Sequence, residues 1–185
     1  PDGIKKNFSN SIKGNELAKS ISSSLSKSAI AISINGQLKD LDFEINKDCD
    51  AQIITKESEL GIEILRHDAA HVMAEAVKIL YPDVQVTIGP PIENGFYYDF
   101  SKKEPFTPED LIKIEKKMLE IINKNEPFKR EVWDRKKAIN YFKNQGELYK
   151  TEIIKDIPNK DEISIYKQGK FLDLCRGPHS PSTGR

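Results

Sequence analysis

The sequence predicts an α+β protein with a small N-terminal module and a larger domain that combines an antiparallel sheet with packed helices. Two observations favour this class: short β-type runs bounded by turn residues occur in both halves, and segments with apolar spacing of three and four lie between them. The first 59 residues also contain no His, Trp or Tyr and are rich in Ser and Asn. We therefore expect two domains, residues 1–58 and 59–185, with the boundary at 56–61.

The N-terminal module is predicted to be one small sheet with a helix. Ala29–Ile34 alternates Ala, Ile and Ser, and Asn35-Gly36 follows directly. Asn-Gly between extended runs favours a two-residue hairpin, because both turn positions require positive φ. The other expected elements of the module are strands at Ile4–Phe8, Gln37–Phe43 and Ala51–Thr55 and a helix at Asn15–Ile21.

Two long helices organise the larger domain. Apolar residues recur at three and four over Ile62–Leu80, and Tyr81-Pro82 ends the pattern. A second helix is expected from Thr107 to about Asn123, because a hydroxyl cap, a proline and two acidic residues open it. The remaining expected elements are strands at Val84–Ile88, Phe96–Phe100 and Phe128–Trp133, a helix after Asp134 through Phe142, an ambiguous amphipathic segment at Glu147–Lys155, and a hairpin of Ile163–Tyr166 and Phe171–Leu174.

Composition excludes several classes of function. The 29 basic and 29 acidic side chains balance, which excludes a uniformly basic nucleic-acid coat but not a local basic stripe. No apolar run reaches the roughly 20 residues of a membrane span, and no export signal opens the chain. Two cysteines cannot form a disulfide framework, so we expect a cytoplasmic protein. Both ends look cut, and a fragment of a longer protein is expected.

The chain has only three histidines, and all of them stand in spaced pairs. His67 and His71 are four apart on the first long helix, so both imidazoles project from one face. Cys175 and His179 flank Gly177-Pro178, a rigid bend. Nitrogen and sulfur donors of these types can bind zinc or line a polar reaction site.

A plainer interpretation exists for each pair alone. Two histidines at helical spacing are often a solvated face, and a cysteine before a loop is often a small buried hydrophobe. Two features favour a site. The pairs together use every histidine of the chain, and Asp173 and Lys150 stand nearby as polar residues suited to catalysis.

At these residues the sequence resembles the amino-terminal region of bacterial threonyl-tRNA synthetases over nearly its whole length. The matching segments, in order, are Ile64–His71, Ile88–Asp99, Gly146–Lys150 and Asp173–His179. The two spaced pairs alone are shared with alanyl-tRNA synthetase editing domains and free-standing trans-editing proteins. Asn94–Asp99 and the N-terminal module favour the threonyl family.

The resemblance implies a ubiquitin-like β-grasp (TGS) module at 1–58 and a tRNA-editing (SAD-type) domain at 59–185. The first strand of the module is expected before Pro1-Asp2-Gly3, and it is either missing or outside this chain. The resemblance also implies that the class II ligase domain and the anticodon-binding domain lie outside this chain. Such a fragment cannot itself activate threonine. The parent enzyme is expected to be a homodimer, while the fragment is compatible with a monomer.

The activity that the resemblance implies is hydrolysis of the seryl ester of tRNA(Thr) mischarged with serine. Serine lacks one methyl group of threonine, and a methyl group changes binding by only about 1–3 kcal/mol, so a second hydrolytic site is needed. The implied catalytic residues are His67, His71, Lys150, Asp173, Cys175 and His179, with Tyr98 lining the substrate cleft and Arg176 meeting the terminal phosphate.

Roles follow from the same resemblance. Lys150 is expected to act electrostatically on water or the carbonyl, and Asp173 to hold the serine ammonium group or orient Lys150. His67 and His179 are expected to hold water and the ribose hydroxyl, and Cys175 to be a wall rather than a nucleophile. No metal is expected to be obligatory, although zinc on His67, His71, Cys175 and His179 stays open.

The expected partner is the acceptor end of tRNA, with no membrane. Candidate basic stripes are Lys113, Lys116 and Lys117, then Lys129 and Arg130, then Arg135, Lys136 and Lys137. The rival hypotheses are a zinc-dependent hydrolase of another substrate, an alanyl-type or free-standing trans-editing module, and a non-catalytic RNA-binding module.

Overall fold

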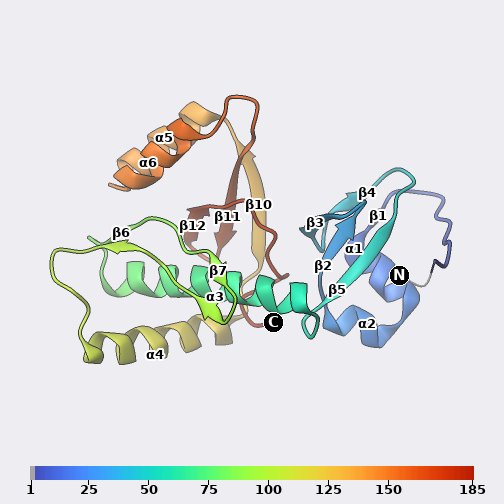
Figure 1. The fold of residues 1–185 in the computed structure, drawn as a ribbon, viewed down its shortest axis with the longest axis horizontal. Helices are drawn as coiled ribbons and strands as arrows, with labels where there is room; N and C mark the ends of the chain where they lie inside the picture. Colours follow the sequence, from blue (N-terminus) through green and yellow to red (C-terminus); the bar gives the residue numbers. More distant parts are fainter. Residues whose placement is uncertain (1–2) are drawn as a thin grey trace. The chain divides into compact units, whose positions relative to one another are not determined.

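The computed structural model describes residues 3–185 and has the α+β class that the sequence predicts (Figure 1). The chain forms two compact units. One comprises the residues up to Leu65 together with Gly177–Pro181 and Arg185, and the other comprises Arg66–Arg176 with Ser182–Gly184. The domain boundary expected from the sequence at 56–61 stays a prediction.

The first unit contains a three-stranded antiparallel sheet in the order β3-β2-β5, and two further strands, β1 and β4, pair with each other. Asn35 and Gly36 have φ of 49° and 82°, which confirms the predicted hairpin turn. The bounds are β1 Ile12–Lys13, α1 Gly14–Ile21, α2 Ser23–Ser28, β2 Ala29–Ile34, β3 Gln37–Asp40, β4 Glu44–Ile45 and β5 Ala51–Thr55.

The prediction of a strand at Ile4–Phe8 is wrong. These residues carry no strand, and the first one of the described chain is β1. Ile4 is 70% exposed and Phe8 is 42% exposed, so neither apolar side chain contributes to a buried sheet face. A β-type run forms a strand only where a partner strand takes its hydrogen bonds and a core covers one side.

The second unit is built on a three-stranded antiparallel sheet in the order β10-β11-β12, with two short pairs, β6–β9 and β7–β8. Helix α3, Glu59–Leu80, runs from the first unit into the second (Figure 1). The other bounds are β6 Gln85–Val86, β7 Pro91–Ile92, β8 Gly95–Phe96, β9 Phe100–Ser101, α4 Pro108–Lys124, β10 Phe128–Trp133, α5 Arg135–Asn144, α6 Leu148–Asp156, β11 Ile163–Gln168 and β12 Phe171–Leu174.

The start of α4 is as predicted, because Thr107 and Asp110 form a reciprocal capping box before the helix. The ambiguous segment at Glu147–Lys155 is helical, as α6. The strands expected at Val84–Ile88 and Phe96–Phe100 are much shorter than predicted. Strand β6 keeps only Gln85 and Val86 of the first, and the backbones of Thr87 and Ile88 hydrogen-bond to Asp99 beyond its end.

Three apolar clusters of described residues lie in this unit, and two of them pack its helices. Val72, Val77, Ile114 and Ile121 belong to the cluster that packs α3 against α4. A second cluster joins the helices α5 and α6 to the three-stranded sheet, and its buried members are Trp133, Ala138, Phe142, Ile154, Ile163 and Ile165. Over residues 3–185, none of the helices combines the length and hydropathy that a membrane crossing needs.

Candidate functional site

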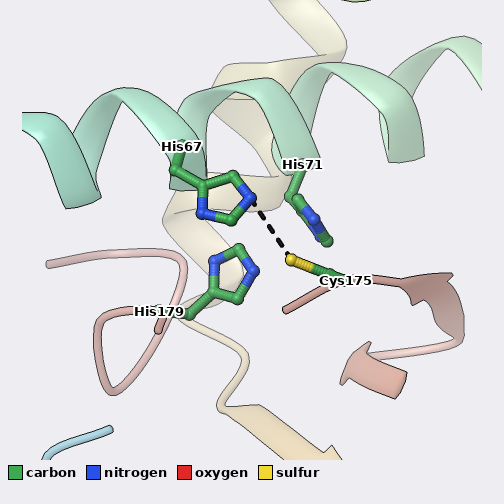
Figure 2. Close-up of side chains that lie close together, drawn as sticks. All are labelled: His67, His71, Cys175 and His179. Atoms are coloured by element: carbon green, nitrogen blue, oxygen red, sulfur yellow. Dashed lines mark hydrogen bonds between the residues drawn. The ribbon is translucent and has the colours of Figure 1, made fainter. Parts of the chain in front are cut away.

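The structure brings the four spaced donor side chains together (Figure 2). His67 and His71 project from successive turns of α3, with ring centroids 5.2 Å apart and planes at 84°. Sγ of Cys175 lies 3.3 Å from Nε2 of His67. The donor atoms of these three residues and His179 all lie within 4.8 Å of one another. The two histidines spaced by four on the helix and the Cys–His pair spaced by four on the loop therefore bring their donor atoms into one cluster.

Local packing fixes the imidazoles. His71 is 3% exposed, and the rings of Phe128 and Phe171 lie edge-on to it at centroid distances of 6.4 and 6.5 Å. His179 is 1% exposed, and its backbone N–H donates to the Asp40 carboxylate at 3.0 Å. Rings held this closely have few accessible rotamers, which suits a site that must present nitrogen atoms in a set geometry.

A buried ion pair forms the second part of the site. Nζ of Lys150, on α6, lies 2.7 Å from Oδ1 of Asp173, on β12, and both side chains are 2% exposed. The Tyr98 hydroxyl donates to Oδ2 of Asp173 at 2.8 Å and lies 3.4 Å from the Lys150 ammonium group. The backbone N–H of Leu174 donates to Oδ1 of Asp173. Both oxygens of Asp173 are thus engaged by the protein itself.

Tyr98 remains a hydrogen-bond donor at all physiological pH values. Burial, followed by the nearby Asp173 carboxylate, raises its pKa well above the usual value for a phenol. The ring stacks on Phe100, with centroids 4.9 Å apart. It also lies so close to Gly89 that a Cβ built on that glycine would stand 2.1 Å from Cδ2 of the ring. The ring therefore has little room to move.

Comparisons with known proteins show which proteins the chain is similar to. The family model of the TGS domain matches residues 1–55, and that of the threonyl and alanyl tRNA synthetase second additional domain matches residues 163–185. Threonine–tRNA ligases of Rickettsia akari, Parvibaculum lavamentivorans and Pelagibacter ubique are 55%, 55% and 56% identical to this chain over 184, 185 and 185 residues. These matches cover 100% of the chain.

The relatives of this chain are threonine–tRNA ligases, which match it over its whole length. It corresponds to the N-terminal part of these ligases and spans 28–29% of their length. The first unit accordingly carries a TGS module, which is a β-grasp fold, and an editing domain follows it. The fold class and the resemblance to threonine–tRNA ligases that the sequence predicts are both confirmed.

The donor set suits zinc by type. Three imidazoles and one thiol are all zinc ligands, and the 3.3 Å between Cys175 and His67 is the spacing of two ligands on one ion. A tetrahedral zinc ion would bring every pair to about 3.3–3.6 Å, given its bond lengths of about 2.0–2.3 Å. The four donor atoms lie within 4.8 Å of one another, and these are the residues that would hold such an ion.

The predicted basic stripes are partly used within the fold. Lys117 pairs with Glu120, Arg130 with Glu162 at 3.0 Å, and Lys113 lies 3.9 Å from Asp110. Arg135 donates to backbone carbonyls of Ile154 and Pro158. Lys137 stacks over the Trp133 ring at 4.0 Å. The exposed cations of the stripes include Lys116, Lys129 and Lys136, and Arg176 beside the site is also exposed.

Sequence reasoning missed two parts of this neighbourhood. The close approach of Gly89 to Tyr98 has no signal in the sequence beyond a glycine before two prolines. Glu75 pairs with Gln168 inside the unit. The sequence could have predicted the position of Glu75, because Glu75 continues the four-residue spacing of His67 and His71 along α3.

Proposed function

We propose that this chain carries a tRNA-editing site that hydrolyses the seryl ester of tRNA(Thr) mischarged with serine. The observation that supports it most is the convergence of His67, His71 and Cys175, in a chain whose buried Lys150–Asp173 pair comes from other elements of the same unit. The chemistry is needed because one methyl group allows only about 10–200-fold discrimination in a binding pocket.

Hydrolysis transfers the seryl group from the terminal ribose to water. The water oxygen forms a bond to the ester carbonyl carbon, the bond between that carbon and the ribose oxygen breaks, and the proton of water ends on the ribose oxygen. The products are serine and tRNA with a free hydroxyl. The site must therefore hold water, stabilise the oxyanion and supply a proton path.

Lys150 suits the electrostatic part of this reaction. An ammonium group has three N–H donors. Among residues 3–185, two of them are directed at Asp173 and the Tyr98 hydroxyl. The third is left for the ester carbonyl or for the attacking water. A charge held away from bulk water stabilises a developing oxyanion more strongly than an exposed one does.

Of the two roles considered for Asp173, we propose that it orients Lys150. Its oxygens already accept from Lys150, Tyr98 and the backbone of Leu174, which leaves little capacity for the serine ammonium group. We further propose that His67 and His179 hold water and the ribose hydroxyl, that Cys175 forms a wall, and that Tyr98 lines the cleft. Arg176, which is exposed, meets the terminal phosphate.

The proposed reaction needs no resident metal. Lys150 supplies the electrostatic stabilisation and His67 and His179 hold the water and the ribose hydroxyl, whereas zinc on the same four donors would supply Lewis-acid activation of water. We expect chain treated with EDTA and then dialysed to deacylate seryl-tRNA at the rate of untreated chain. A rate that collapses after chelation and returns with one equivalent of Zn²⁺ would contradict this and favour a zinc-dependent hydrolase.

The direct test of hydrolysis uses the 185-residue chain and tRNA(Thr) carrying radiolabelled serine. We expect the chain to release serine faster than buffer alone does. His67→Ala should lower the rate by about 10²-fold, since a side chain positioned for general acid–base catalysis typically contributes at least that much. His67 is only half-buried, so the variant should fold, as circular dichroism can verify. Seryl-tRNA that survives as long with the chain as without it would contradict the proposal.

A further inference from the structure

A buried polar pair outside the predicted site joins helix α3 to the end of strand β11. Nε2 of Gln168 donates to Oε2 of Glu75 at 2.8 Å, and the two residues are 1% and 9% exposed. Burial raises the pKa of the Glu75 carboxyl above its usual value. Oε1 of Gln168 is buried as well, and within residues 3–185 it has no hydrogen-bond partner. Replacing both members of such a buried pair by apolar groups of similar shape can leave stability nearly unchanged, which leaves room for another role of the pair.

Both members of the pair lie beside His71. Glu75 follows His71 by four residues, one turn further along the same face of α3. Gln168 stands opposite Phe128 on one side and Phe171 on the other in the three-stranded sheet. The rings of these two phenylalanines are the ones that lie edge-on to His71. The hydrogen bond therefore fixes α3 against Gln168, whose cross-strand neighbours Phe128 and Phe171 pack on the imidazole.

Strand β12 connects Phe171 to the other residues of the site. Phe171 and Asp173 point to one face because side chains alternate along a strand, and Cys175 follows two residues later. Phe171 is the cross-strand partner of Gln168. A shift between α3 and the β11–β12 hairpin would move His71 relative to Asp173 and Cys175.

We propose that Glu75 and Gln168 are positioning residues for the editing site: their hydrogen bond sets where the His71 imidazole stands relative to Cys175. The inference rests on the proposed function of that site. Neither residue is required to touch the substrate. The expected signature is a loss of turnover without a matching loss of stability.

The test compares two replacements of the pair. The double variant Glu75→Leu/Gln168→Met removes the bond and leaves no polar group unpaired, so its unfolding temperature should stay near that of the wild type. Its kcat for seryl-tRNA should fall about tenfold, as expected for misplacement of a reacting group. Glu75→Gln keeps both a donor and an acceptor toward Gln168 and should keep kcat within about twofold.

Tyr81→Phe is the matched control. Tyr81 directly follows the C-terminal end of α3, several helical turns after His71. The variant loses one hydrogen bond, from the Tyr81 hydroxyl to Asp110 at 2.7 Å. Its unfolding temperature should fall by a few degrees at most while kcat is unchanged, since a net hydrogen bond contributes about 1 kcal/mol. Loss of turnover in this control equal to that of the double variant would overturn the proposal.

Two results separate this inference from the proposed function. A crystal structure of the double variant should show the His71 ring displaced relative to Cys175. A ring in its original place, or a double variant with wild-type kcat, would overturn the positioning role. If the wild-type chain leaves seryl-tRNA intact, the proposed function fails, and the crystal structure alone still decides whether the pair positions His71.

Discussion

Replacing Lys150 by methionine is expected to lower the rate of seryl-tRNA deacylation by about 100-fold or more, because it removes a preorganised positive charge from the reacting carbonyl. Methionine keeps the unbranched shape of the buried stem. The variant should also be less stable by about 3–5 kcal/mol, since the Asp173 carboxylate, which is 2% exposed, would be left buried without its counter-charge. Single-turnover deacylation and chemical denaturation measure the two effects.

A second variant separates these effects. Lys150→Met/Asp173→Asn removes both charges, and the side-chain oxygen of the introduced asparagine can still accept from either Tyr98 or the Leu174 backbone. Stability should largely return, because no buried charge is left alone. The deacylation rate should stay low. Recovery of the rate together with stability would show that Lys150 serves the fold and not the reaction.

Gly89→Ala is expected to displace the Tyr98 ring and so to damage the site. The new Cβ would stand 2.1, 2.7 and 2.8 Å from Cδ2, Cγ and Cε2 of Tyr98, and the stacked Phe100 ring restricts retreat. Displacing the ring breaks the hydrogen bond from Tyr98 to Asp173. We expect a stability loss of about 1–3 kcal/mol from overpacking. The deacylation rate should fall about tenfold or more.

Gly95→Ala is the matched control for this substitution. Gly95 lies further along the same segment, and a Cβ there would meet nothing within 4 Å. Stability and rate should both remain near wild type. A Gly89→Ala variant as active and as stable as Gly95→Ala would show that Tyr98 does not need its observed position.

Local signals in the sequence predicted the elements that depend on local interactions. Asn35-Gly36 specified its hairpin through two positive-φ positions, and Thr107 specified the start of α4 through its own capping box. The pairing of His67 with His71 followed from helical spacing alone. In each case the partners are close neighbours along the chain, so the pattern contains the whole interaction.

Interactions between distant residues determined what the sequence could not predict. The strand expected at Val84–Ile88 shrank to two residues, and the Val86 N–H is taken by the Glu147 carboxylate, 61 residues away. The bond from Tyr98 to Asp173 spans 75 residues, and that from Gln168 to Glu75 spans 93. The two spaced pairs, which use every histidine of the chain, indicated the four-donor cluster, and the resemblance to a known family supplied its long-range pairing.

The most direct measurement of the central claim compares two substrates that differ by one methyl group. The chain is incubated with tRNA(Thr) carrying serine and, in parallel, with the same tRNA carrying threonine, and the loss of each ester is followed in time. An editing site predicts that the seryl ester disappears while the threonyl ester persists. Equal loss of both esters, or survival of both, would contradict it.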